Sequence, residues 1–151
     1  MLRKLMFAVI ASSALALSAS AFAQATGTAA EAKAMLEKAI AALKANEAAA
    51  LASFNEADGG YSDRDLYVYC FEKSTGKFTA HVNAALMGTD VRALKEKDGA
   101  PLGQKVFDAA KEGTITTISY NFPKPGSTDP VPKEAFVTAV GNEGCGVGYY
   151  K

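Results

Sequence analysis

A central run of the chain, Leu66–Phe71, is apolar on both of its strand faces. Side chains of a β-strand alternate between two faces, so one face carries Leu66, Val68 and Cys70 and the other carries Tyr67, Tyr69 and Phe71. A strand of this kind has another layer packed on each side. The face with aromatic hydroxyl groups is a reasonable wall for a small-molecule pocket; an ordinary core strand whose tyrosines reach its rim is the alternative.

The pattern before this strand predicts a long helix. Residues 29–57 are rich in alanine, and Thr28 with Glu31 is typical of a capping box at the helix start. An apolar stripe at near-helical spacing is formed by Leu36, Ile40, Leu43, Leu51 and Phe54. A helix of this length would span roughly 43 Å, so we expect its first half to project past the sheet. The projection would be a dimer contact, or the helix would lie along its own domain.

The pattern after this strand predicts short helices and further strands. A turn at Ser74–Gly76 leads to a second strand that ends at His81, the only histidine. Short helices are expected at 90–97 and 104–112, a loop at 123–132, and strands at 114–122, 133–140 and 145–151. We therefore predict an α+β fold, with a long N-terminal helix packed on a five-stranded antiparallel sheet and short helices inserted after the second strand.

The N-terminus has the order of a secretory signal peptide. Basic Arg3 and Lys4 precede an apolar run from Leu5 to Leu17, and Ala21-Phe22-Ala23 is a typical cleavage site. A retained membrane anchor is the alternative. We expect cleavage after Ala23, so that residues 1–23 are the signal peptide and 24–151 form one exported, periplasmic domain.

Composition and charge exclude some partners and cofactors. The chain has 16 basic and 16 acidic residues, and no basic stripe, so nucleic acid is not an expected partner. No C-x-x-C-H motif for covalent haem is present. Two distant cysteines and one histidine make a poor zinc site, so we expect neither a metal nor a cofactor.

Cys70 and Cys145 each fall in a strand-like segment. An oxidising compartment favours a disulfide, which requires the two strands to be neighbours because the Cα atoms must lie within about 7 Å. Two buried free thiols are the alternative.

Several local strings, in order along most of the predicted mature chain, resemble the single Cache domain family of PAS-like extracellular sensor modules. They are Phe54-Asn55 with the Gly59-Gly60 turn, Ala80-His81-Val82-Asn83, Gly88 with Leu94 and Asp98-Gly99, Tyr120–Pro125, Lys133–Val137 and Gly146–Tyr150. Val82 stands where the family usually has proline, Phe122 where it has tryptophan and Phe136 where it has tyrosine. Family members usually continue into a membrane helix and a signalling module, whereas this chain stops at Lys151, so it resembles a stand-alone secreted form.

The resemblance implies a set of ligand-binding residues: Tyr69, His81, Tyr120, Lys133 and Phe136. His81 would donate a hydrogen bond to an anionic ligand, and Lys133 would supply a point charge for a carboxylate. The tyrosines would orient the ligand, and Phe136 would be an apolar wall. The alternatives are a structural histidine, a solvated lysine and tyrosines packed in the core.

We expect a periplasmic module that binds a small anionic metabolite, such as a short carboxylate, and acts through a partner such as a membrane receptor or sensor kinase. No nucleophile motif accompanies His81, and Asp63 and Asp65 are more typical of a turn than of an acid–base pair, so we do not expect an enzyme. The alternative is a protein–protein interaction module that uses the long helix, for example to form a homodimer, with a vestigial pocket.

Overall fold

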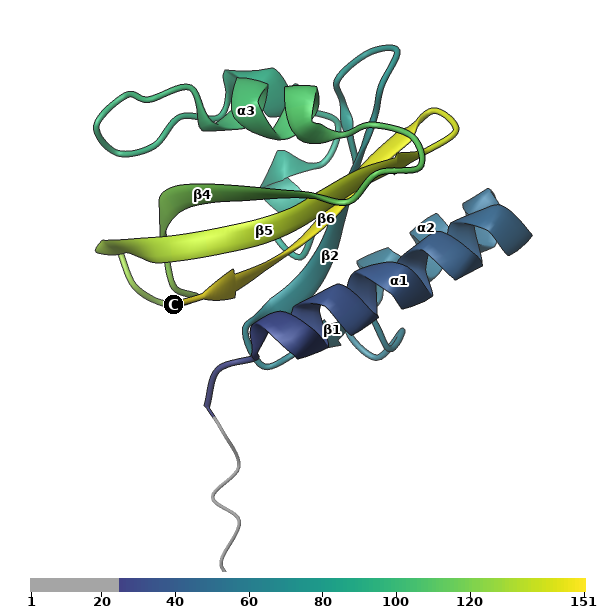
Figure 1. The fold of residues 1–151 in the computed structure, drawn as a ribbon, viewed down its shortest axis with the longest axis horizontal. Helices are drawn as coiled ribbons and strands as arrows, with labels where there is room; N and C mark the ends of the chain where they lie inside the picture. Colours follow the sequence, from purple (N-terminus) through teal and green to yellow (C-terminus); the bar gives the residue numbers. More distant parts are fainter. Residues whose placement is uncertain (1–24) are drawn as a thin grey trace, which may run out of the picture.

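The computed structural model describes residues 25–151, and the predicted signal peptide lies outside them. One antiparallel sheet forms the centre of this region, with helices on both of its faces (Figure 1). The strands are β1 (Ser62–Asp63), β2 (Leu66–Glu72), β3 (Phe78–Ala80), β4 (Thr116–Pro123), β5 (Pro130–Val140) and β6 (Glu143–Tyr150). Their order is β1-β2-β6-β5-β4, and β3 also pairs with β2. The predicted α+β class is confirmed, with β1 as an additional two-residue strand.

Helix α1 (Ala29–Ala45) packs against β2, β5 and β6. The predicted capping box is present: the backbone N–H of Glu31 donates to Thr28 Oγ1 (3.2 Å), and the N–H of Thr28 donates to Glu31 Oε2 (2.7 Å). Ala32 and Leu36 in the first half of α1 are fully buried, so this half lies on the sheet and does not project past it.

The prediction of one continuous helix over residues 29–57 is wrong. Asn46 adopts an extended conformation and separates α1 from α2 (Glu47–Asn55), and its side-chain oxygen accepts the N–H of Ala49 (3.0 Å). Asparagine is a preferred N-cap because this side-chain bond satisfies a helix-end donor. Lys38 Nζ donates to the carbonyl of Gly60 (2.9 Å), so the chain beyond α2 returns to the middle of α1. The region is therefore a bent pair of helices.

The opposite face of the sheet is covered by the segment between β3 and β4 (Figure 1). This segment contains two 3₁₀ turns, η1 (Ala84–Leu86) and η2 (Val91–Ala93), and helix α3 (Leu102–Ala109). A helix predicted at 90–97 is only the turn η2, because Leu94 is extended and its carbonyl accepts the N–H of Gly103 (2.9 Å). The second predicted helix is present as α3 with shifted ends.

Strand β2 separates two apolar clusters, as its two-sided pattern predicted. Leu66, Val68 and Cys70 are buried against α1 and α2, whereas Phe71 and Tyr69 are buried toward α3. Side chains on both faces of this strand are removed from water, which is the main contribution to its stability. No helix among residues 25–151 has the length and apolar character needed to cross a membrane.

Candidate functional site

A small cavity of about 30 Å³ lies on the α3 side of the sheet; we call it the inner cavity. The sheet and the residue that follows β3 contribute rings to its wall: Tyr67, Tyr69, Phe78, His81, Tyr120 and Phe122. The covering segment contributes aliphatic side chains: Val91, Leu94, Leu102 and Val106. The strand face that the sequence marked as a possible pocket wall therefore does line a cavity.

Glycines of β6 make the space for the larger side chains of this face. Alternate positions of β6 point toward the cavity side, and they are Gly144, Gly146 and Gly148. A Cβ on Gly146 would overlap the hydroxyl of Tyr69, and one on Gly148 would lie 2.6 Å from Cε of Lys133 and 3.0 Å from the hydroxyl of Tyr120. The glycine pattern near the C-terminus thus allows these side chains to lie across the strand.

Lys133, on β5, is 2% exposed, and its ammonium group is enclosed by aromatic rings. Nζ lies 4.5 Å from the ring centre of Tyr150, 4.9 Å from that of Tyr67 and 5.4 Å from that of Phe122. The hydrogen bond to the hydroxyl of Tyr150 is long, at 3.4 Å. Within residues 25–151 no carboxylate forms an ion pair with this ammonium group.

Burial lowers the pKa of Lys133 to about 8, and the charge of Asp65 opposes this shift. The group is therefore largely cationic at neutral pH despite its burial. Cation–π contacts compensate only part of the desolvation of an ammonium group, each contributing roughly 0.5–2 kcal/mol. Lys133 is thus a buried cation with no carboxylate at ion-pair distance among the described residues, and the charge of Asp65 acts on it only from farther away.

His81 follows β3 and lines the inner cavity. Its Nδ1 accepts the backbone N–H of Asn83 (2.9 Å), so in the neutral ring Nε2 carries the proton and is a donor. Burial, and then the charge of Lys133, lowers the pKa of His81 to about 4. The imidazole is therefore a neutral hydrogen-bond donor at physiological pH.

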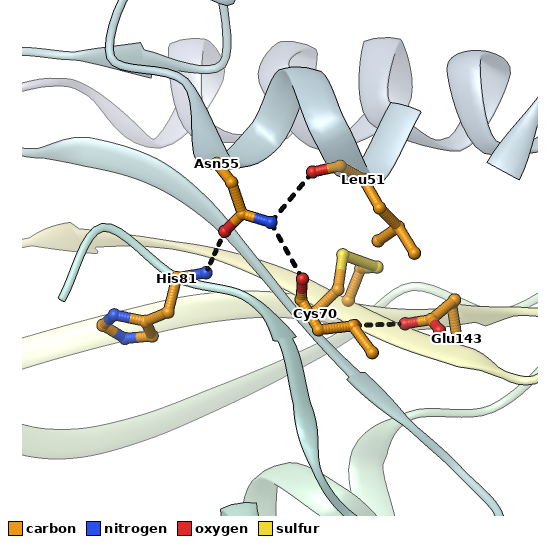
Figure 2. The surroundings of a disulfide bond; sticks show 7 residues. Leu51, Asn55, Cys70, His81 and Glu143 are labelled. Atoms are coloured by element: carbon orange, nitrogen blue, oxygen red, sulfur yellow. Dashed lines mark hydrogen bonds between the residues drawn. A yellow bond between two sulfur atoms is a disulfide. The ribbon is translucent and has the colours of Figure 1, made fainter. Parts of the chain in front are cut away.

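Figure 2 shows how α2 holds the backbone of His81. The side-chain oxygen of Asn55 accepts the His81 N–H (3.2 Å), and its nitrogen donates to the carbonyls of Thr79 (2.9 Å) and Leu51 (3.0 Å). Asn55 therefore links the end of α2 to a residue within β3 and to the residue that follows this strand.

Tyr69 and Tyr120 both line the inner cavity, and their hydroxyl groups lie against Gly146 and Gly148 of β6. The hydroxyl of Tyr69 is buried and has no hydrogen-bond partner among the described residues. Burial raises the pKa of both tyrosines well above the ordinary value, so both remain protonated. An unsatisfied buried hydroxyl is unfavourable unless a ligand or a water supplies its partner.

The structure does not bring Phe136 to the cavity. Phe136 lies on the other face of β5, where its ring stacks on Tyr149 with 5.5 Å between centres, and it packs against the cluster under α1. Lys133 and Phe136 are three residues apart on one strand, so they must face opposite sides. The four other predicted site residues gather on the α3 side, although Lys133 lies behind the rings and lines neither cavity.

Sequence reasoning placed Tyr67 on a possible pocket wall, but it did not include Tyr67, Phe122 or Tyr150 among the ligand-binding residues. Tyr67 lies two positions before Tyr69 and Phe122 lies two positions after Tyr120, so each pair shares one strand face. This alternation was the available signal.

A second cavity, of about 280 Å³, lies beside the inner one; we call it the outer cavity. Tyr67, His81 and Phe122 line both cavities and form the boundary between them. The rest of the outer wall comes from residues after β3 and from the connection between β4 and β5, with Tyr150.

Cys70 and Cys145 form a disulfide on the opposite face of the sheet, which confirms the predicted pairing (Figure 2). The two residues are direct partners in the β2–β6 register, with 4.1 Å between their Cα atoms. With the buried carboxyl of Glu143 they form a group of potential metal ligands, but the bonded sulfur atoms are not available as thiolates. This group therefore supplies a cross-link and not a metal site.

The model of the family "Single Cache domain 2" matches residues 8–150 of the chain. A search of the curated proteins finds no match. The family match confirms the resemblance that the sequence strings indicated.

Solved structures with a similar fold include a methyl-accepting chemotaxis protein from Vibrio parahaemolyticus RIMD 2210633 (22% identity, TM-score 0.64, covering 80% of this chain and 86% of that one). A second is described as the periplasmic sensor domain of a chemotaxis protein (26%, 0.58, covering 80% and 88%). A third is described as a Cache chemosensory domain that recognises carboxylic acids (20%, 0.56, covering 80% and 86%).

Proposed function

Because the chain belongs to the single Cache domain 2 family, we propose that it binds a small monoanionic carboxylate at Lys133. Cache sensor domains are non-catalytic modules that bind small ligands. The finer assignment, a carboxylate held at this lysine, rests on the chemistry of the site.

The observation that carries the proposal is the buried ammonium group that forms no direct ion pair with a carboxylate of the described residues. Lys133 is 2% exposed, and in the described part of the chain its polar contact is one long bond to Tyr150. Buried charges in proteins are normally paired, because desolvation of an isolated ion costs several kcal/mol. A bound carboxylate would supply the missing negative charge.

The neighbouring groups suit the same ligand. His81, Tyr69 and Tyr120 line the inner cavity, and each side chain has a hydrogen-bond donor, whereas a carboxylate has two oxygens that accept. A neutral His81 donates without adding a second buried charge. Carboxylic acids are also the ligands named for one of the similar Cache structures.

We further propose that residues 1–23 are a signal peptide, that the domain works in the periplasm, and that a membrane receptor or sensor kinase is its partner. Two of the similar structures come from chemotaxis proteins, and one of them is a periplasmic sensor domain. Ligand binding would influence such a partner only through different affinities for two states of the assembly.

Isothermal titration calorimetry and thermal-shift measurements on residues 24–151 with a panel of monocarboxylates test the proposed ligand class. We expect at least one carboxylate to raise the melting temperature, and Lys133→Met to weaken its binding by 100-fold or more. Methionine keeps most of the side-chain volume while removing the charge. Lys44→Met changes an exposed lysine of α1 and should leave binding unchanged. Equal binding by the wild type and Lys133→Met would refute the role of this lysine.

A further inference from the structure

We propose that the ligand is a monocarboxylate with an apolar tail, and that the outer cavity binds this tail. This inference rests on the proposed function, because it takes Lys133 as the group that holds the carboxylate. It adds a second subsite and a ligand subclass.

The volumes of the two cavities indicate which part of the ligand each cavity can hold. The inner cavity has about 30 Å³. A single water molecule needs a cavity of about 10–15 Å³, so the inner cavity holds about two groups of that size. Two such positions suit the two oxygens of one carboxylate, whereas a carbon chain exceeds the space. The outer cavity, at about 280 Å³, has room for several further groups.

The two cavities are adjacent through a shared wall. Tyr67, His81 and Phe122 line both, and the rings of Tyr67 and Phe122 also lie over the ammonium of Lys133. A carboxylate that reaches the ammonium must displace part of this ring contact, and displacement of the same two rings joins the cavities. The chain of such a ligand would then extend past His81 into the outer cavity.

The lining of the outer cavity favours an apolar tail. Its aliphatic and ring surfaces come from Val82, Leu86, Phe122, Pro123 and Pro125. Among the described residues that line either cavity there is no aspartate or glutamate, so the ammonium group of a free amino acid would find no carboxylate partner. Lys124 is exposed to solvent and lies over the Tyr150 ring, 5.4 Å from its centre. The only cationic side chain of the outer wall among the described residues is thus hydrated and exposed, so it would contribute little to binding a second carboxylate, and the other polar side chains that line only this cavity, such as Asn83 and Ser127, are uncharged.

A homologous series tests the tail subsite on residues 24–151. Calorimetric titration with acetate, butyrate and hexanoate should show affinity rising about fourfold per methylene, the transfer of one buried CH₂ from water. Succinate and alanine should bind more weakly than butyrate.

Two variants of the outer wall, with one control, assign this trend to the cavity. Leu86→Ser should reduce the increment per methylene to less than twofold while acetate affinity changes little. Val82→Ser, at a position 52% exposed, should have a smaller effect of the same sign and does not threaten folding. Met87→Ser is the control: Met87 follows Leu86 in the sequence, is exposed and lines neither cavity, so this variant should keep the wild-type gain in affinity per methylene.

The outcomes separate the two proposals. If acetate binds in a Lys133-dependent manner but longer chains bind no better, or if succinate binds best, the tail subsite is wrong and the proposed function stands. An increment that survives both Leu86→Ser and Val82→Ser also overturns the outer cavity as the tail site. If no carboxylate binding depends on Lys133, the proposed function is wrong and this inference falls with it.

Discussion

Asn55 holds His81 by its backbone: the Asn55 side-chain oxygen accepts the His81 N–H at 3.2 Å, from the last residue of α2 (Figure 2). The amide nitrogen of the same side chain donates to the carbonyl of Thr79. Helix α2 lies on the α1 side of the sheet, and the imidazole lines the inner cavity on the other side. The Asn55–His81 bond is therefore a direct link between the helix layer and the candidate site.

Asn55→Ala should weaken carboxylate binding because it releases the backbone that positions the Nε2–H donor. We expect a loss of about threefold to tenfold in affinity, and about 1 kcal/mol in the free energy of unfolding, the usual contribution of such hydrogen bonds. Calorimetry and urea denaturation measure the two quantities.

Asn142→Ala is the control for this change. The Asn142 side chain also bridges two segments, with bonds to Ser74 and Glu72, but away from both cavities. It should cost similar stability without loss of affinity. Equal losses of affinity in both variants would show that Asn55 acts only through general stability.

Gly146→Ala should destabilise the fold because its Cβ would overlap the Tyr69 hydroxyl and lie 3.0 Å from the carbonyl of Phe136. We expect a loss of about 1–3 kcal/mol in the free energy of unfolding, typical of overpacking. A double-mutant cycle with Tyr69→Leu, followed by urea denaturation, should show that the second change costs less in the alanine background than in the wild type. Strict additivity would mean that Tyr69 is not the group that requires glycine at 146.

The disulfide should contribute substantially to stability because it closes a loop between residues 75 positions apart. In the chain-entropy model, this loop length corresponds to about 4 kcal/mol. The double variant Cys70→Ala/Cys145→Ala should therefore unfold at a much lower urea concentration than the oxidised wild type. Dithiothreitol should lower the midpoint of the wild type and leave that of the variant unchanged; a wild-type midpoint that ignores the reductant despite confirmed reduction would contradict the assignment.

Alternation along single strands made much of this architecture predictable. The two apolar faces of Leu66–Phe71 indicated layers on both sides, and these layers are α1 with α2 and the α3 segment. The same rule, applied to β5, would have separated Phe136 from Lys133. Phe136 was expected in the site from family resemblance, and strand geometry excludes it.

Other features depend on contacts between distant segments, which sequence patterns do not encode. The alanine-rich pattern continues on both sides of Asn46, and an asparagine there is compatible with a continuous helix or with an N-cap. The structure has the cap, and the bond of Lys38 to Gly60 joins segments that are distant in the sequence. The rings around Lys133 come from three different strands, and together they separate its ammonium group from both cavities.

Lys133→Met should stabilise the ligand-free protein at neutral pH. Burial lowers the pKa of Lys133 from 10.5 to about 8, so the unfolded chain binds this proton more tightly than the folded protein does. The resulting penalty is complete below pH 8, decreases as pH rises from about 8 to 10.5, and is absent above that range. Replacing buried ion pairs with apolar side chains of similar volume stabilises proteins by up to roughly 1–4 kcal/mol, and we expect a gain in stability of the same order here.

Urea denaturation of the wild type and Lys133→Met from pH 7 to 9.5 measures this penalty. The variant should be more stable at pH 7, and the difference should shrink with rising pH. The buried tyrosines also lower stability in alkali, because their pKa values are raised in the folded protein. This contribution is the same in both proteins, so it cancels when they are compared at the same pH. A variant that is less stable at pH 7, by an amount independent of pH, would indicate that the ammonium is already well compensated in the ligand-free protein.

Carboxylate affinity should have the opposite dependence on pH, because the ligand needs the ammonium form of Lys133. With a pKa of about 8 in the free protein, affinity should be nearly constant from pH 5.5 to 7.5 and should fall toward tenfold per pH unit above pH 8. His81, with a pKa lowered to about 4, stays neutral throughout this range and does not change the pH dependence of the affinity.

Calorimetry with butyrate from pH 5.5 to 9.5 measures this profile. Binding above pH 8 should be coupled to proton uptake, seen as a dependence of the binding enthalpy on the buffer. Affinity that stays constant to pH 9.5 would show that the bound anion does not contact Lys133, whereas a fall centred near pH 6.5 would transfer the charge to His81.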